Sequence, residues 1–264
     1  LPYGVSYNSY LIDDEMVALV DTVDICYFEV YLRKIKQVIG ERPINYLIIN
    51  HMEPDHSGSI RLIKQHYPGI IIVGNKQTFG MIEGFYGVTG EQYLVKEGDF
   101  LALGHHKLRF YMTPMVHWPE TMMTFDETDG VLFSGDGFGC FGTVDGGFLD
   151  TRINVDKYWG EMVRYYSNIV GKYGSPVQKA LQKLGGLPIS AICSTHGPVW
   201  TENIAKVIGI YDRLSRYDAD EGVVIAYGSM YGNTEQMAEA IAEELSAQGV
   251  KNIVMHNVTK SHPS

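Results

Sequence analysis

A set of seven side chains that can bind metals spans most of the chain. Four are histidines and three are acidic residues. They are His51, Glu53, Asp55, His56, His117, Asp136 and His196. A single first-row transition metal takes three or four protein ligands, so this set is too large for one ion. It therefore predicts two metals that share a bridging carboxylate.

Apolar runs lead into these ligands and must position them. A strand predicted at 46–50 leads directly into His51, and strands at 131–134 and 189–194 end just before Asp136 and His196. Pro54 is expected to exclude a regular helix or strand from the segment 51–56. The stretch 136–147 is rich in Gly and Phe and is predicted to be a loop beside the metals.

The remaining pattern predicts strands and helices that alternate in two successive halves. Further strands are predicted at 5–12, 17–21, 70–73, 92–96, 100–103, 107–113 and 121–126. Helices are predicted at 28–39, 60–67, 76–86, 155–173, 176–184 and 202–217. With ligands at the strand ends, this order predicts an α/β (α+β) chain that begins with an αββα sandwich.

The pattern changes after a short polar linker at 218–222. A buried strand at 223–227, a turn at 228–234, a helix at 235–248 and a second strand at 252–255 follow. We therefore expect two domains, at 1–218 and 223–264. Leu1 runs almost at once into an apolar segment and the chain stops just after a strand, which predicts a piece of a longer protein.

Composition narrows the possible classes of function. The chain has 264 residues, 45% hydrophobic and 20% charged, which is typical of a globular protein. Its formal net charge of −10, without a basic stretch, argues against nucleic acid and membranes as partners. The sequence predicts neither a signal peptide nor an apolar run long enough to span a membrane. Cys26, Cys140 and Cys193 are isolated, which predicts buried thiols in a reducing cytoplasm.

The ligand pattern as a whole resembles that of the flavodiiron proteins. Its parts are the motif His-x-Glu-x-Asp-His at 51–56 and the later ligands His117, Asp136 and His196. Members of that family carry a metallo-β-lactamase-like domain that reduces dioxygen or nitric oxide at a non-haem diiron site. The resemblance implies that the ligands of this chain form such a catalytic centre.

The resemblance assigns three ligands to the first iron. They would be His51, Glu53 and His117. Hydrolases of the metallo-β-lactamase type carry His where this chain has Glu53. A carboxylate there adds a hard anionic donor and favours iron that cycles between two oxidation states.

The second iron is assigned by the same resemblance. Asp55 and His196 would bind it, and Asp136 would bridge both irons. Two interpretations of His56 stay open. It is either a further ligand of the metal centre, or it is turned aside and water takes its place. The isolated His66, His105, His106 and His256 are predicted to be surface or hydrogen-bonded residues.

A second resemblance lies near the C-terminus. The hexapeptide resembles the phosphate loop of flavodoxins, in which hydroxyls and backbone N–H groups at a helix start surround the phosphate of FMN. Its residues are Ser229, Met230, Tyr231, Gly232, Asn233 and Thr234. The loops that hold the flavin ring are expected beyond residue 264, so the FMN site within this chain is incomplete.

Several aromatic residues lie near the ligands in sequence. Each is predicted to be ordinary core, although together they could line the substrate pocket or shield it from water. They are Tyr7, Tyr27, Trp118, Phe138 and Phe141.

The predicted function is reduction of O2 to water, of NO to nitrous oxide, or both, with two Fe and FMN as cofactors. The resemblance implies a head-to-tail homodimer or a dimer of dimers, and an electron donor such as rubredoxin or a reduced deazaflavin. One alternative is a dinuclear zinc hydrolase of the metallo-β-lactamase type, against which Glu53 argues. Another is a metal-binding electron-transfer module without enzymatic activity.

Overall fold

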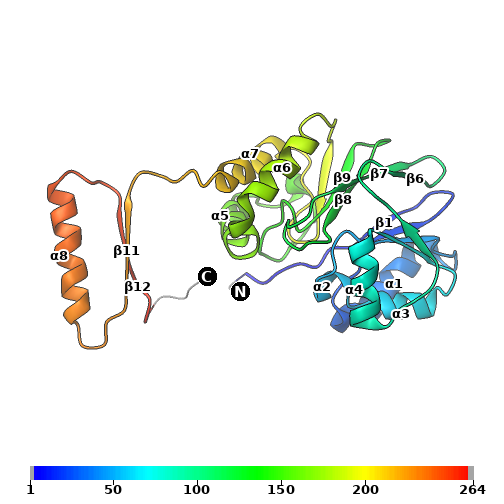
Figure 1. Ribbon diagram of the computed structural model, residues 1–264, viewed down its shortest axis with the longest axis horizontal. Coiled ribbons are helices and arrows are strands. Elements are labelled where there is room, and N and C mark those ends of the chain that lie inside the picture. Colours follow the sequence, from blue (N-terminus) through cyan, green and yellow to red (C-terminus); the bar gives the residue numbers. More distant parts are fainter. Residues whose placement is uncertain (1–2, 261–264) are drawn as a thin grey trace. The chain divides into compact units, whose positions relative to one another are not determined.

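Two five-stranded sheets pack face to face in the first part of the chain (Figure 1). The computed structural model describes residues 3–260, and the chain divides into two units between Tyr217 and Asp218. Among the described residues, no helix has the length and apolar character needed to cross a membrane.

The first sheet has the strand order β1-β2-β3-β4-β5. Its members are β1 (Tyr10–Ile12), β2 (Ala18–Val20), β3 (Tyr46–Ile48), β4 (Ile71–Gly74) and β5 (Gln92–Leu94). β1 runs antiparallel to β2, and the other pairs are parallel. Because β2, β3 and β4 are parallel, the loops that follow them lie along one edge of the sheet.

The second sheet has the strand order β10-β9-β8-β7-β6. Its members are β6 (Phe100–Ala102), β7 (Lys107–Met112), β8 (Met122–Asp126), β9 (Val131–Gly135) and β10 (Ala191–Ser194). Only the pair β9 and β10 is parallel. β7 and β9 are both antiparallel to β8, so β7, β9 and β10 all end at the same edge of this sheet.

Alternation along the strands separates three apolar layers. Ala18, Val20 and Ile48 point into the core between the sheets, whereas Leu19 and Leu47 pack against helices on the outer face. The helices on that face are α1 (Phe28–Ile39), α3 (Ile60–His66) and α4 (Lys76–Tyr86). The outer face of the second sheet is covered by α5 (Asp156–Tyr165), α6 (Gly174–Leu184) and α7 (Ile204–Ser215). The predicted αββα sandwich is confirmed.

Helix α1 shows how the sequence specifies this layer. Its buried side chains include Phe28, Leu32, Ile35 and Ile39, which recur at helical spacing along one face. The helix ends at Gly40, which has a φ of +63° that glycine adopts readily. The predicted bounds of this helix match the structure.

Some predicted elements are wrong in extent. The strand expected at 5–12 is reduced to β1, because Val5 forms an isolated bridge with Gly142 and the N–H of Asn8 donates to the carbonyl of Thr195. The helix expected at 155–173 ends at Tyr165. A π-helical turn η3 (Tyr166–Val170) and a 3₁₀ turn η4 (Gly171–Tyr173) follow, where Gly171 weakens the preference for a continuous α-helix.

Two expectations near the metal-binding loop also need correction. Pro54 does not exclude a helix but begins one, α2 (Pro54–Ser57), because the first helical turn requires no N–H from its first residue. Cys26 lies exposed in the 3₁₀ turn η1 (Ile25–Tyr27), whereas Cys140 and Cys193 are buried as predicted. A further 3₁₀ turn, η2 (Asp150–Arg152), precedes α5.

The second unit is one β-α-β element. β11 (Val223–Tyr227) pairs in parallel with β12 (Ile253–Asn257), and α8 (Asn233–Ala247) connects them. Val223 and Ile225 lie on the more buried side of β11, whereas Val224 on the other side is largely exposed. This arrangement matches the predicted strand-turn-helix-strand order.

Candidate metal centre

All seven predicted ligands meet at one edge of the sandwich. The segment from His51 to His56 follows β3 of the first sheet. His117 lies in the connection between β7 and β8, Asp136 follows β9, and His196 follows β10. Because these strands end at the same edge, residues far apart in sequence converge there.

The ligands form two neighbouring groups. One group is His51, Glu53, His117 and Asp136, and the other is Asp55, His56 and His196. Within each group, one candidate ligand atom per residue lies within 4.8 Å of those of the others. Each group supplies the three or four ligands that one transition metal requires.

Asp136 is a member of the first group, but its carboxylate also contacts the second group. Its Oδ2 lies 3.0 Å from Nε2 of His117, and its Oδ1 lies 3.1 Å from Nε2 of His56. The side chain is buried, so bulk water does not reach these oxygens. One oxygen faces each group, which is the geometry that a bridging carboxylate requires.

Unpartnered buried atoms make the site suitable for cations. Nε2 of His56 lies 3.1 Å from Nε2 of His196, and the Oδ1 of Asp55 has no hydrogen-bond partner among the described residues. Two imidazole nitrogens this close, with Oδ2 of Asp55 at 3.3 and 3.4 Å from them, would be satisfied by a metal ion between them. The donor set therefore fits a dinuclear centre.

Proton affinities in the first group reflect its concentration of carboxylates. Burial by itself lowers the pKa of His51, but Asp136, Glu120 and Glu53 outweigh burial and raise it to about 10. Hydrogen bonds with His117 and His51 lower the pKa of Glu53 to about 2. The group therefore stabilises positive charge at the imidazoles, and a metal cation would take the place of those protons.

Glu120 orients His51 and was not predicted from the sequence. Its Oε1 accepts hydrogen bonds from Nδ1 of His51, at 2.9 Å, and from the backbone N–H of Met52, at 2.8 Å. A carboxylate can only accept here, so Nδ1 carries the proton and Nε2 is free to bind metal. The sequence signal was slight, an acidic residue three positions after His117.

The N-terminal segment orients His196 in the second group. The carbonyl of Ser6 accepts a 2.7 Å hydrogen bond from Nδ1 of His196, and Ser6 Oγ accepts one from the N–H of Gly197. The amide of Asn8 donates to the carbonyls of Ser194 and Gly197, on either side of the histidine. These hydrogen bonds fix the ring of His196 and leave its Nε2 available to a metal ion.

His56 is not oriented in this way, because its Nδ1 has no hydrogen-bond partner among the described residues.

Asp21 and Thr22 hold the backbone of the segment 50–56 in place through hydrogen bonds. Asp21 Oδ1 accepts hydrogen bonds from the backbone N–H groups of Asn50 and His51, at 2.8 and 3.2 Å. Thr22 Oγ1 donates to the carbonyl of His56 at 2.7 Å. These buried residues follow β2, and the apolar pattern of that strand gave no sign of their role.

Tyr165 is a further residue that sequence reasoning missed. It is buried, its ring centroid lies 5.5 Å from that of His196, and its hydroxyl has no partner among the described residues. Burial raises its pKa well above the usual range, and the charges of Asp136, Asp55 and Glu53 raise it further. The hydroxyl is therefore free to donate a hydrogen bond near the predicted metal centre.

Of the aromatic residues singled out in the sequence, two contact ligand histidines. Tyr7 packs 5.7 Å from His196, and Trp118 lies perpendicular to His51 at 5.3 Å. Tyr27 contacts the ring of Tyr7. Phe138 packs on Tyr211 and Phe141 on Tyr165, so these two are core residues behind the site.

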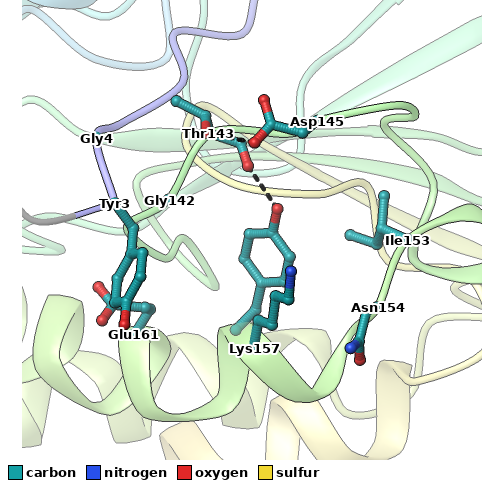
Figure 2. Close-up of a pocket in the computed structure, with 10 residues that line it drawn as sticks. Tyr3, Gly4, Gly142, Thr143, Asp145, Ile153, Asn154, Lys157 and Glu161 are labelled. Carbon is teal, nitrogen blue, oxygen red and sulfur yellow. Dashed lines mark hydrogen bonds between the residues drawn. The ribbon is translucent and has the colours of Figure 1, made fainter.

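One cavity lies away from the predicted ligands. It measures about 660 Å³, and none of the seven ligands lines it. Helix α5 carries Lys157 and Glu161 along one side, and Thr143 and Asp145 lie on the opposite side (Figure 2). A cavity of about 540 Å³ is lined in part by Tyr7 and so adjoins the surroundings of His196.

The predicted phosphate loop lies between β11 and α8. Gly232, with a φ of +88°, turns the chain into the helix, and its N–H donates to Ser229 Oγ at 3.0 Å. Met230 and Tyr231 are almost fully exposed, and Asn233 and Thr234 begin α8. Backbone N–H groups at this helix start are available to an anion.

Comparison with known proteins gives two family matches. Residues 5–197 match the model described as ODP family beta lactamase, and residues 225–264 match the flavodoxin family. The chain is 34% identical to an anaerobic nitric oxide reductase flavorubredoxin from Vibrio vulnificus over 244 residues, 91% of this chain and 49% of that protein.

Two solved structures match nearly the whole chain. The chain matches the flavodiiron protein of Giardia intestinalis with a TM-score of 0.92 at 29% identity, over 98% of this chain and 64% of that one. It matches rubredoxin oxygen:oxidoreductase of Desulfovibrio gigas with a TM-score of 0.94 at 30% identity, over 99% and 66%. The chain thus spans about half to two thirds of the length of these relatives.

Proposed function

Because the chain belongs to the family described as ODP family beta lactamase and matches a solved flavodiiron protein, we propose that it acts as an oxidoreductase with a non-haem diiron centre. The reaction is reduction of dioxygen to water, of nitric oxide to nitrous oxide, or both. The observation that carries the proposal is the position of Asp136, with one carboxylate oxygen facing each ligand group.

The two groups would hold one iron each. His51, Glu53 and His117 bind the first, and Asp55, His56 and His196 bind the second. His56 is included because its Nε2 lies 3.3 Å from Asp55 Oδ2 and faces the same space as His196. When bound, the irons supply redox electrons and open positions for a diatomic substrate.

The protein's own residues prepare this site for its substrate. Glu53 offers a hard oxygen donor where an imidazole would favour zinc. Tyr165 offers a buried hydroxyl that can donate a hydrogen bond to the reacting molecule. Trp118 and Tyr7 cover ligand histidines and limit access of water to the centre.

Electrons would come from FMN bound through the loop from Ser229 to Thr234. Support comes from the flavodoxin match and from the helix start that follows Gly232. The named relatives suggest rubredoxin as the electron donor, with a reduced deazaflavin as the other option. We further propose a head-to-tail homodimer in the cytoplasm, in which the flavin of one chain serves the metals of the other.

Anaerobic reconstitution with ferrous iron tests the proposal. The chain should bind two irons and, after chemical reduction, consume NO or O2 in a single exposure, with nitrous oxide counted by gas chromatography. Asp136→Asn should bind no more than one iron tightly and lose this consumption, whereas Asp145→Asn on the exposed surface should match the parent. Two tightly bound irons in Asp136→Asn would contradict the bridging role.

The hydrolase alternative predicts a different outcome from the same preparation. A dinuclear zinc hydrolase would bind two zinc ions in preference to iron and would not consume either gas after reduction. Hydrolysis of an ester, thioester or lactam by the zinc-loaded chain, together with redox inactivity of the iron-loaded chain, would favour that reading.

A further inference from the structure

A second cluster of metal-binding side chains lies at the opposite edge of the sandwich. His106 is in the turn between β6 and β7, and Asp126 ends β8. Asp129 is in the turn between β8 and β9, and Asp14 is in the turn between β1 and β2. β9 runs from this edge to Asp136, which separates the cluster from the diiron ligands by roughly 17 Å of extended chain.

Asp14 fixes the orientation of the histidine ring. Its Oδ2 accepts a 2.8 Å hydrogen bond from Nδ1 of His106 and another, at 2.7 Å, from the backbone N–H of the same residue. The turn can approach this closely because Gly104 has no Cβ; one placed there would lie 2.9 Å from Asp14 Oδ1. Because a carboxylate holds Nδ1, Nε2 is presented to the other members of the cluster.

Two carboxylates face Nε2 at distances longer than good hydrogen bonds. Asp129 Oδ2 lies 3.4 Å away and Asp126 Oδ2 lies 3.9 Å away. Tetrahedral ligands that are each about 2.1 Å from a metal lie about 3.4 Å from one another. The spacing therefore fits three ligands around a cation better than it fits direct hydrogen bonds, which favour about 2.9 Å.

Burial distinguishes this cluster from an ordinary group of surface acids. The Asp126 side chain is 5% exposed and Asp14 is 6% exposed, whereas Asp129 at 61% forms the outer rim. Asp126 Oδ1 accepts from the N–H of Thr128, but no hydrogen bond reaches its Oδ2 from any described residue. This oxygen lies 3.9 Å from Nε2 of His106 and is therefore free to accept a cation at the cluster.

The negative charge of the cluster also favours a bound cation. Three carboxylates surround one imidazole, and within residues 3–260 no lysine or arginine pairs with any of the three. Arg42 reaches only the backbone carbonyl of Asp14 and the side chain of Asp13. A divalent ion would neutralise most of this negative charge.

We propose that His106, Asp126 and Asp129 form a third metal site, for a divalent transition cation such as Zn²⁺, with Asp14 as the residue that orients His106. Water completes the coordination on the exposed side of Asp129. The ion is structural. It joins the turns of the second sheet to the β1–β2 turn of the first sheet through the contact between His106 and Asp14.

Zinc titration of the iron-loaded protein tests this proposal. After two irons are bound, isothermal titration calorimetry with Zn²⁺ should show one further equivalent per chain, with the iron content unchanged by metal analysis. Zinc should also raise the melting temperature. Asp129→Asn should weaken zinc affinity at least tenfold and reduce the thermal shift, and His106→Gln should abolish both effects.

The control variant also replaces an aspartate by asparagine, but at a position outside the cluster. Asp145→Asn alters an exposed carboxylate outside the cluster and should bind the third equivalent as the parent does. Zinc uptake only in exchange for iron, or equal uptake in the parent and the His106→Gln variant, would overturn the proposal. The same holds if no third equivalent binds, since the cluster would then be a hydrogen-bonded imidazolium only.

Discussion

Glu120 and His51 are joined by a buried 2.9 Å hydrogen bond although they are 69 positions apart in sequence. The same carboxylate oxygen also receives the backbone N–H of Met52, so a single side chain fixes both the ring and the loop that carries it. A ligand histidine held in this way loses little rotational freedom when it binds metal, which strengthens the metal site.

Replacing Glu120 should therefore weaken iron binding. Glu120→Gln removes the charge but keeps the size, and we expect the affinity for one of the two irons to fall about tenfold to a hundredfold. Competition with a chelator, followed by iron analysis, measures this loss. Glu91→Gln is an exposed control. Equal retention of iron by both variants would show that Glu120 only supports the loop.

Glu53 should select iron over zinc. Glu53→His replaces a carboxylate by an imidazole, which zinc accepts well. When equal amounts of both metals are offered, the variant should contain several-fold more zinc relative to iron than the parent. Glu83→His adds a histidine at an exposed position of α4 and serves as the control. An unchanged metal ratio in Glu53→His would mean that selection resides elsewhere.

Tyr165→Phe should separate reactivity from stability. It removes a buried hydroxyl without a partner, so the metal-free chain should be as stable or more stable, by up to about 1 kcal/mol in urea unfolding. Iron content should stay the same, while single-exposure consumption of NO or O2 slows by about tenfold or more.

Tyr166→Phe is the matched control for that change. Tyr166 is also buried, and its hydroxyl has no hydrogen-bond partner within residues 3–260, but its ring packs on Tyr211. Its pKa is raised by burial and then by Tyr217, not by the carboxylates of the metal centre. We expect a similar effect on stability and no effect on rate. Equal slowing in both variants would remove the assigned role of Tyr165.

Asp150 should contribute to stability in a pH-dependent way. This buried carboxylate accepts five hydrogen bonds from Thr201, Glu202 and Asn203, just before α7. Burial alone raises its pKa, but bonds from Thr201 and Asn203 outweigh burial and lower it. Asp150→Ala should therefore cost about 2 to 4 kcal/mol of unfolding free energy at neutral pH.

The pH dependence follows from the direction of that shift. A folded pKa below the unfolded value of about 3.9 gives stability that is present above that pH and is lost as pH falls through the folded pKa. The difference between parent and Asp150→Ala should thus shrink in acid. Urea unfolding at several pH values measures it, with Asp145→Ala as the exposed control. A constant difference at all pH values would contradict the assigned charge effect.

The main features of the fold were predictable because their signals are local. Apolar runs lead into the predicted ligands, and the strands predicted at 17–21 and 46–50 are present as β2 and β3. The resemblance to flavodiiron proteins, drawn from the motif at 51–56 and the later ligands, is confirmed by the family and structural matches. The ligand roles of individual residues stay predictions.

The supporting residues were not predictable from the same signals. Glu120, Asp21 and Tyr165 reach the centre through contacts between distant parts of the chain, and no sequence spacing encodes such contacts. Pro54 was misread because a proline that blocks a helix interior is favoured at a helix start. His106 is isolated in the sequence because its acidic neighbours come from the β1–β2 turn and from the end of β8 with the turn that follows it.

The hydrogen bond between Ser6 and His196 spans 190 positions and sets an order of events during synthesis. Ser6 and Asn8, which hold this last predicted ligand, are synthesised before residues 194–197 and lack these partners until those residues emerge. At about 5 to 20 residues per second, that interval lasts roughly 10 to 40 seconds. The predicted first ligand group is complete once Asp136 has emerged, so we expect the growing chain to capture one metal before it can hold the second.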